Sequence, residues 1–119
     1  MKLKNSIITL LVVLFLGGCA QPSKNLYYWG DYQNTVYRYY QSDKVAPEQQ
    51  IASLQEVVEK SKATNLPVPP GLHAHLGMLY SNTGHSELAI TEFGLEKSLF
   101  PESAVFMDSL INKSKGSKK

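Results

Sequence analysis

The chain has 119 residues, with twelve basic and ten acidic side chains, a formal net charge of +2 and a single cysteine. Its length suits one small domain, its near-neutral charge argues against a nucleic-acid-binding protein, and one cysteine excludes an intramolecular disulfide. We therefore expect a single domain that is held together by apolar packing.

The N-terminal stretch has the pattern of an export signal. Lys2 and Lys4 form a positive region, and residues 7–16 form an apolar core that ends at small residues. This core is shorter than the roughly 20 residues that a membrane-spanning helix needs. We predict that residues 1–18 are a signal peptide, which the mature chain lacks.

The end of this signal resembles the lipobox of bacterial lipoproteins, which signal peptidase II cleaves. Its residues are Leu16, Gly17, Gly18 and Cys19. The resemblance implies a diacylglycerol group on the Cys19 thiol and an acyl chain such as palmitate on its new amino group. Several acyl chains anchor a protein stably, because each buried methylene contributes roughly 0.8 kcal/mol. Ala20, where aspartate would retain a lipoprotein in the inner membrane, implies the outer membrane, facing the periplasm. The alternative is a plain secretory signal with an incidental cysteine.

The mature chain divides by composition into three parts. Cleavage before Cys19 removes two lysines and leaves ten basic and ten acidic residues, so the mature chain is near neutral. Residues 19–25 are short and polar, and we expect them to be an acylated tether. Residues 26–112 form the predicted helical domain. Residues 113–119 contain only lysine, serine and glycine, which predicts a disordered basic tail.

Residues 25–41 hold six of the seven tyrosines and the only tryptophan. Their spacing predicts one face of a helix that begins near Asp31 or Gln33. The positions on this face are Trp29, Tyr32, Val36, Tyr39 and Tyr40, and Tyr37 lies off it.

Three interpretations of this aromatic segment stay open. The rings can cover the exposed face of a helical hairpin further along the chain. They can form a protein interface, because tyrosine, tryptophan and arginine dominate binding hot spots. They can also lie against lipid headgroups. For the interface, which we prefer to the lipid contact, the candidate partner-binding residues are Tyr28, Trp29, Tyr32, Arg38, Tyr39 and Tyr40.

A second helix is expected to open at Pro47 and Glu48, because proline suits the first helical turn and an acid suits the positive end of the helix dipole. Its apolar stripe consists of Ile51, Leu54, Val57 and Val58. The helix should fade near residues 63–65, before a proline-rich connector at 66–71 that cannot be helical. A proline-rich ligand for an aromatic groove is the alternative interpretation of this connector.

Residues 73–102 follow the order of small and large residues of the tetratricopeptide repeat, a helical hairpin of about 34 residues. The matching positions are Leu76, Gly77, Tyr80, Ala89, Phe93 and Pro101. Two positions depart from the pattern, with His73 in place of tryptophan and Glu96 in place of a small residue. The alternative is an ordinary hairpin that matches by chance. A single hairpin cannot bury both faces, so flanking segments must cover it.

The apolar faces of this hairpin and of the following helix can be predicted from their spacing. The first helix of the hairpin presents Leu72, Leu76, Leu79 and Tyr80, and the second presents Leu88, Ala89, Ile90, Phe93 and Leu99. Residues 82–84 separate the two helices, with Gly84 suited to a left-handed turn. Pro101 opens a last helix with Val105, Phe106, Leu110 and Ile111 as its buried side.

The titratable residues do not form a recognisable reaction centre. His73 and His75 are two apart and point to different sides of a helix, unlike the i, i+4 pair of a zinc site. Glu92 and Glu96 are neighbours on one helix, which is common on a solvated face. No nucleophile or phosphate-binding motif occurs. We predict no metal site, no cofactor besides the acyl chains, no small-molecule substrate and no enzymatic activity.

The blocks LYYWGDY, PPGLHAHLGMLY and EKSLFPESAVFMDSL, which follow the lipobox, resemble bacterial lipoproteins of domain-of-unknown-function 4810. The resemblance implies a small outer-membrane lipoprotein. Relatives in this family are often encoded beside a curli-secretion-channel-like lipoprotein and another small lipoprotein. Together with the helical patterns, it predicts an all-α domain of four to five helices with tetratricopeptide-like hairpins.

The expected function is that of a non-enzymatic module for interaction or assembly at the outer membrane, with other outer-membrane or periplasmic proteins as partners. A complex with a curli-secretion-channel-like lipoprotein would fit the neighbourhood of the relatives. The alternatives are a pilotin-like chaperone for an outer-membrane pore and a cell-wall-binding lipoprotein.

Overall fold

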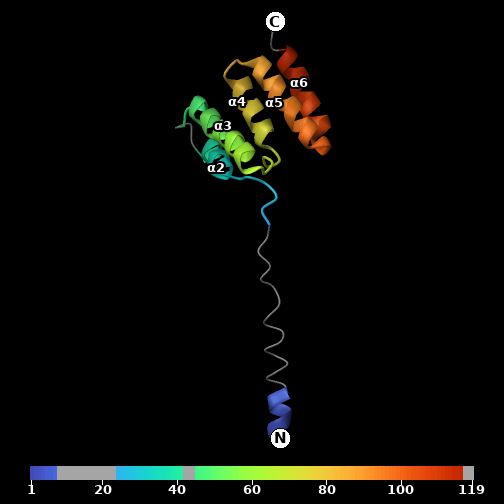
Figure 1. Cartoon of the computed structure of the whole chain (residues 1–119). Coiled ribbons are helices and arrows are strands. Elements are labelled where there is room, and N and C mark those ends of the chain that lie inside the picture. The colour runs from blue at the N-terminus through green and yellow to red at the C-terminus, as the bar shows by residue number, and fades with distance from the viewer. Residues whose placement is uncertain (8–23, 42–44, 117–119) are drawn as a thin grey trace.

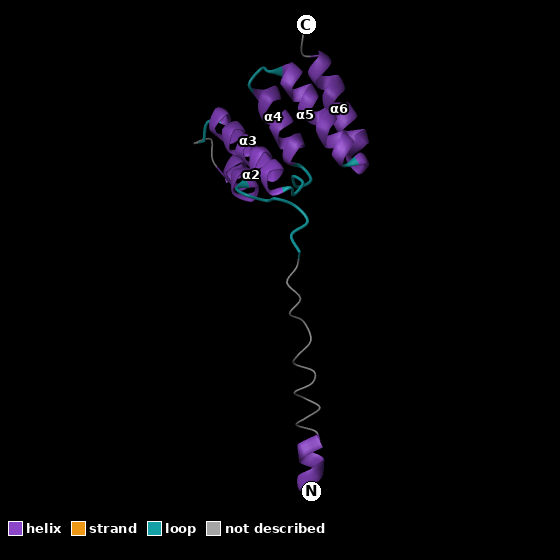
Figure 2. Ribbon diagram, in the orientation of Figure 1, coloured by secondary structure: helices purple, strands orange, loops and turns teal. Residues whose placement is uncertain are grey.

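The computed structural model describes residues 1–7, 24–41 and 45–116 (Figure 1). From residue 24 onward, these ranges contain five α-helices, α2 to α6, and a short 3-10 helix, η1. They contain no strand (Figure 2). The prediction of an all-α fold with four to five helices is therefore confirmed. The lipobox with Cys19, most of the tether and residues 117–119 lie outside the described residues.

Helices α2 (Tyr32–Gln41) and α3 (Pro47–Thr64) form the first part of the domain. Helix α3 begins at Pro47, as predicted, and ends where Asn65 adopts a left-handed conformation with a φ of 53°. Asparagine tolerates this conformation, which lets its N–H bond back to the last turn of the helix. Leu54 and Val57 of α3 are buried in the core, and so is Val68 of the connector.

Helices α4 (Leu72–Asn82) and α5 (Ser86–Leu99) form an antiparallel hairpin. Gly84 turns the chain between them with a φ of +81°. Gly77 of α4 lies directly against the ring of Phe93 in α5, so a Cβ at residue 77 would come within 2.4 Å of that ring. The close approach of the two helices thus depends on the small residue that the sequence pattern places there.

Both faces of the hairpin are covered, as the sequence requires. Helix α3 packs against α4 on one side, and α6 (Ala104–Gly116), which follows η1 (Pro101–Ser103), packs against α5 on the other (Figure 1). One continuous core results. It contains Leu54, Val57, Val68, Leu72, Leu76, Leu79, Tyr80, Ala89, Phe93 and Met107.

The predicted apolar faces of α5 and α6 were partly wrong. Leu88 and Leu99 of α5 are exposed, while Ala89 and Phe93 are buried. In α6 the expected Val105 and Phe106 are exposed, and Met107 is buried in their place. The buried or half-buried stripe of α6 is Met107, Leu110, Ile111 and Ser114. Its steps of three and four residues leave Val105 and Phe106 on another side of the helix.

The last helix also runs further than the sequence suggested. We predicted that residues 113–119 are disordered, but residues 113–116 complete the last turn of α6. Ser114 is buried there, because it falls on the inward stripe that includes Met107 and Ile111. A small residue can occupy such a position in spite of its polarity, so composition alone misplaced the end of the helix.

Gly77→Ala should lower the free energy of unfolding in urea by about 1–3 kcal/mol, because the added methyl group overpacks the contact with Phe93. Alanine is otherwise the better helix former by about 1 kcal/mol. Gly94→Ala is the matched control, since a Cβ at this position of α5 would meet no atom within 4 Å. It should leave stability unchanged or raise it. Equal effects of the two substitutions would contradict the close approach at Gly77.

Candidate interaction surface

A buried carboxylate fixes the start of α4. Gly71, which precedes the helix with a φ of 92°, has no side chain that could cap it. Glu96 of α5 supplies the missing acceptor, because its Oε1 accepts a hydrogen bond from the Gly71 N–H at 2.7 Å and its Oε2 one from the Ala74 N–H at 3.3 Å. Glu96 is only 3% exposed. A carboxylate at this position satisfies free amides and complements the positive end of the helix dipole.

A second polar contact joins the same two helices. His73 Nδ1 of α4 lies 2.6 Å from Glu92 Oε2 of α5, and both side chains are largely buried. The expectation that Glu92 and Glu96 occupy a solvated face was therefore wrong. One helix turn apart, both carboxylates point at α4. The two positions that depart from the repeat pattern, His73 and Glu96, are the positions that make these contacts.

Tyr32, the first residue of α2, is held at the same end of α4. A Cβ at Gly71 would come within 2.7 Å of the Tyr32 hydroxyl, so both the left-handed φ and the available space require glycine there. Burial raises the pKa of Tyr32, and the nearby Glu96 carboxylate raises it further. The phenol therefore remains neutral and packs beside the capped helix end.

Three of the predicted partner-binding residues, Tyr28, Tyr32 and Tyr39, are half-buried and pack against the core. The backbone N–H of Tyr28 donates a hydrogen bond to the Pro67 carbonyl at 2.8 Å. The Tyr39 ring meets His75 of α4 edge-on, with ring centroids 4.8 Å apart. These tyrosines thus cover the α3 and α4 side of the hairpin, which is the first of the three interpretations of the segment.

Three further aromatic side chains of the segment are exposed. Trp29 is 39% exposed, Tyr37 61% and Tyr40 74%. Trp29 stacks on Tyr32, with ring centroids 6.2 Å apart, so the exposed rings are continuous with the buried ones. We refer to Trp29, Tyr37 and Tyr40 as the aromatic surface.

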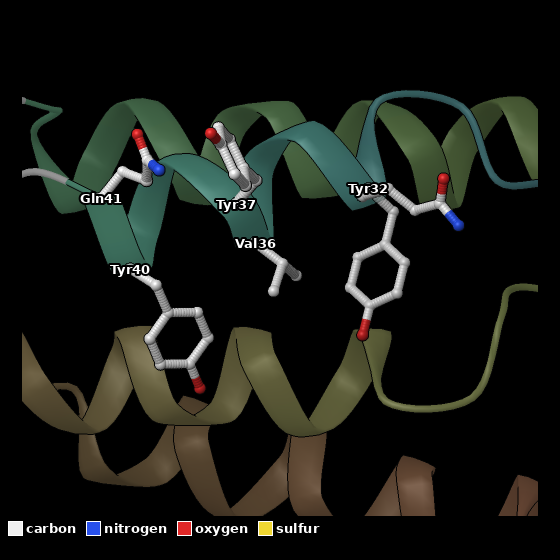
Figure 3. A pocket seen from close by; sticks show the side chains of 6 residues that line it. Tyr32, Val36, Tyr37, Tyr40 and Gln41 are labelled. Atoms are coloured by element: carbon white, nitrogen blue, oxygen red, sulfur yellow. The ribbon is translucent and has the colours of Figure 1, made fainter.

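An open hollow of about 560 Å³ lies along α2 at this surface (Figure 3). Its lining residues are Tyr32, Gln33, Val36, Tyr37, Tyr40 and Gln41. In the close view, Tyr32, Val36 and Tyr40 point to one side of α2 and Tyr37 to the other (Figure 3). The hollow therefore combines apolar ring faces with amide and hydroxyl groups, which suits contact with another protein.

Arg38 also lies at the surface, but its guanidinium is already paired with an acidic residue directly before α2. Its guanidinium forms an ion pair with Asp31, and both side chains are close to half-exposed. Asp31 in addition accepts a hydrogen bond from the Asn34 amide at 2.9 Å. Because Asp31 precedes the helix, this small network holds the start of α2 in place and orients Arg38 along the helix.

The structure thus separates residues that the sequence grouped together. Tyr40, which spacing placed on the same helix face as Tyr32 and Tyr39, is the most exposed ring of the segment. Tyr37, which we did not include among the candidates, lines the hollow. Its position off the apolar face was the signal that could have identified it, because a residue off the buried face of a packed helix faces solvent.

The histidines that were considered as metal ligands serve in packing. His73 faces Glu92 and His75 faces Tyr39, so the two point to different neighbours. Within the described ranges, no group of three histidine, cysteine, aspartate or glutamate side chains is placed to hold a metal ion. In the same part of the chain, no helix is both long enough and apolar enough to cross a membrane.

These features define a small all-helical protein with an exposed aromatic surface beside the segment that leads into its domain. The chain belongs to the family described as Domain of unknown function (DUF4810), whose family model matches residues 26–110. The match extends from the segment before α2 into α6 and confirms the resemblance carried by the three sequence blocks. The tetratricopeptide-like character of the hairpin stays a prediction. No curated protein and no solved structure matches the chain.

Glu96→Ala should lower the free energy of unfolding by about 1–3 kcal/mol, because two part-buried N–H groups lose a charged acceptor. Glu59→Ala is the control, since Glu59 is an exposed acid of α3 that pairs with Lys62. Exposed pairs contribute about 0–1 kcal/mol, so the control should unfold close to the unmodified protein in urea. A Glu96→Ala protein as stable as the control would show that the cap contributes nothing.

The stability of the fold should fall as the pH is lowered through about 6.5, the ordinary pKa of histidine. Burial lowers the pKa of His75, and its Nε2 is buried with no hydrogen-bond partner among the described residues. Below that pH, the unfolded chain therefore binds a proton at residue 75 that the folded chain does not bind. The free energy of unfolding is highest above about pH 6.5 and decreases as the pH falls below it. Urea unfolding at several pH values should show a smaller acid loss for His75→Phe. His85→Asn is the control at an exposed position, and this variant should lose as much stability in acid as the unmodified protein. An equal acid loss of stability in His75→Phe would contradict the assignment to His75.

Proposed function

We propose that this protein is a lipoprotein of the outer membrane that faces the periplasm and acts as a non-enzymatic module for protein interaction. The sequence of residues 1–19 supports the anchor, because a positive region, an apolar core and a lipobox occur in the required order. The aromatic surface supports the interaction. The proposed partner is another outer-membrane or periplasmic protein, such as a curli-secretion-channel-like lipoprotein.

The observation that carries the proposal is the exposure of Trp29, Tyr37 and Tyr40 on one short segment. Tyrosine and tryptophan are the residues that contribute most often to binding hot spots, because their rings bury a large area with few rotatable bonds. Three tyrosines of the same segment already cover the core, so packing of the domain does not explain the three exposed rings.

The arrangement also suits a binding surface because it is rigid. Helix α2 is attached to α4 through Tyr39 and His75, and a hydrogen bond at 3.4 Å joins the Asn82 amide to the Tyr39 hydroxyl. Tyr32 is fixed at the capped end of α4. Tyr37 and Tyr40 are therefore presented from a helix that is held at both ends, and Trp29 stacks on Tyr32 at its first residue. Fixed positions lower the entropy lost on binding.

Trp29→Ala and Tyr40→Ala should each weaken binding of the partner by roughly 30-fold, the equivalent of about 2 kcal/mol for a hot-spot ring. Phe106→Ala is the control, because Phe106 is an exposed aromatic residue of α6 outside the aromatic surface. Its exposure of 61% lies between that of Trp29 and that of Tyr40. Crosslinking and co-purification with a curli-secretion-channel-like lipoprotein in mild detergent measures the effect, and circular dichroism checks the fold. Partner retention by all three variants would exclude the aromatic surface.

The same preparation distinguishes the alternative functions. A pilotin-like chaperone would bind its pore during transport and be absent from the finished pore. A cell-wall-binding lipoprotein would sediment with purified peptidoglycan in the absence of other proteins. Either result would replace the proposed role while leaving the anchor in place.

The anchor itself is tested by intact-mass analysis of the mature protein. We expect a chain that begins at Cys19 and carries a diacylglyceryl group and an additional acyl chain. Cys19→Ser should leave a precursor that retains residues 1–18, because signal peptidase II cleaves before a lipidated cysteine. A secreted chain with an unmodified thiol would contradict the proposal.

A further inference from the structure

A groove with mainly apolar walls lies at the end of the domain where the tether enters. Its volume is about 840 Å³, and it lies between the last turns of α3 and α5 and the segment before α2. The apolar side chains that line it include Tyr27, Val58, Leu66, Leu95, Leu99 and Phe100. Leu95 and Leu99 of α5 are exposed. The sequence predicted Leu99 on the buried face of α5, but packing within the domain leaves both leucines uncovered.

The segment that leads from the tether is attached to this end of the domain. The ring of Tyr27 meets that of Phe100 edge-on, with centroids 6.2 Å apart, and the N–H of Tyr28 donates to the carbonyl of Pro67. Leu26, immediately before these contacts, is exposed. Figure 1 shows the chain entering at the end of the domain where α3 and α5 finish and α4 begins. We refer to Leu26, Leu95, Leu99 and Phe100 as the tether-end patch.

The length of the tether limits how far this patch can lie from the membrane. From Cys19 to Tyr27, a fully extended chain spans at most roughly 26–29 Å. This argument rests on the proposed function, because it requires acyl chains on Cys19. Within that limit, the tether-end patch surrounds the point where the tether enters the domain, because Leu26 belongs to it and the neighbouring Tyr27 contacts Phe100.

The charges around the groove fit a phospholipid surface. Among its described lining residues none is acidic, and Lys62, which also pairs with Glu59, lies at its edge. Lys24 of the tether is exposed nearby in sequence. Leucine and aromatic side chains next to lysines are the combination that enters the boundary between headgroups and acyl chains.

We propose that the tether-end patch lies on the bilayer, with Leu26, Leu95 and Leu99 in the headgroup region. The occupant of the groove is thus membrane lipid rather than a second protein. In this orientation α4 begins and α5 ends at the membrane, so the hairpin stands upright. Tyr37 and Tyr40, the part of the aromatic surface that lies on α2, then face sideways into the periplasm, where a partner can reach them.

Fluorescent labels at the two ends of the hairpin test this orientation in the full acylated protein. Leu99→Cys places a nitrobenzoxadiazole label in the patch, and Asn82→Cys places one at the far end of α4, at an exposed residue. Acylation blocks the thiol of Cys19, so only the new cysteine reacts. The proteins are reconstituted in vesicles of phosphatidylethanolamine and phosphatidylglycerol, with or without nitroxide-labelled acyl chains.

We expect the label at residue 99 to lose fluorescence to the nitroxide lipids and to be shielded from aqueous iodide, while the label at residue 82 shows the reverse. Leu95→Cys repeats the test should the Leu99→Cys protein lose its helical circular dichroism. Equal iodide quenching at both ends would overturn the inference. Shielding from iodide without loss to nitroxide lipids would also overturn it, because a second protein copy would then cover the patch.

Flotation of the vesicles and the mass of Cys19 separate this inference from the proposed function. A protein that floats and carries acyl chains, but whose labels behave alike at both ends, refutes the membrane orientation alone. A protein that neither floats nor carries acyl chains refutes the proposed anchor and this orientation with it.

Discussion

The fold depends on a carboxylate from one helix that completes the start of another. Gly71 has a positive φ and no side chain, so α4 begins without a cap of its own. Glu96 reaches across from α5 and accepts hydrogen bonds from two N–H groups at that end. Because a buried charge is costly unless it is fully bonded, the cap ties the position of α5 to the start of α4. Tyr32, and with it the first turn of α2, then packs beside that end.

The same constraint determines which aromatic rings remain available. With α4 fixed, Tyr32 and Tyr39 of α2 have half-buried positions against it, and Tyr40 projects into solvent. A single aromatic segment therefore serves two purposes. Its buried rings attach α2 to the hairpin, and its exposed rings form the surface for which we propose a protein partner. The covering and interface interpretations of the segment are both compatible with this division.

The helices themselves could be predicted from the sequence because their signals are local. Pro47 starts α3, the prolines of the connector end the helical pattern, and Gly84 turns the hairpin. The repeat pattern also identified Gly77 as a small position of the hairpin, and the structure shows that the ring it lies against is that of Phe93. The predictions of burial that were wrong depend on neighbours that are distant in sequence. The burial of Glu96 requires knowledge that α4 lacks a cap, and the exposure of Leu99 and Phe106 requires knowledge of where α6 lies against α5.

Amide hydrogen exchange at Gly71 and Ala74 tests the central claim most directly. The first N–H groups of a helix have no partner within it and ordinarily exchange fast. With the Glu96 carboxylate as their acceptor, these two amides should exchange slowly, as do amides within α4. They should exchange more slowly than the amides at the start of α5, a helix whose N-cap residue, His85, makes no capping hydrogen bond with its own side chain. Exchange of the Gly71 and Ala74 amides at the rate of an unstructured chain would contradict the cap and the account built on it.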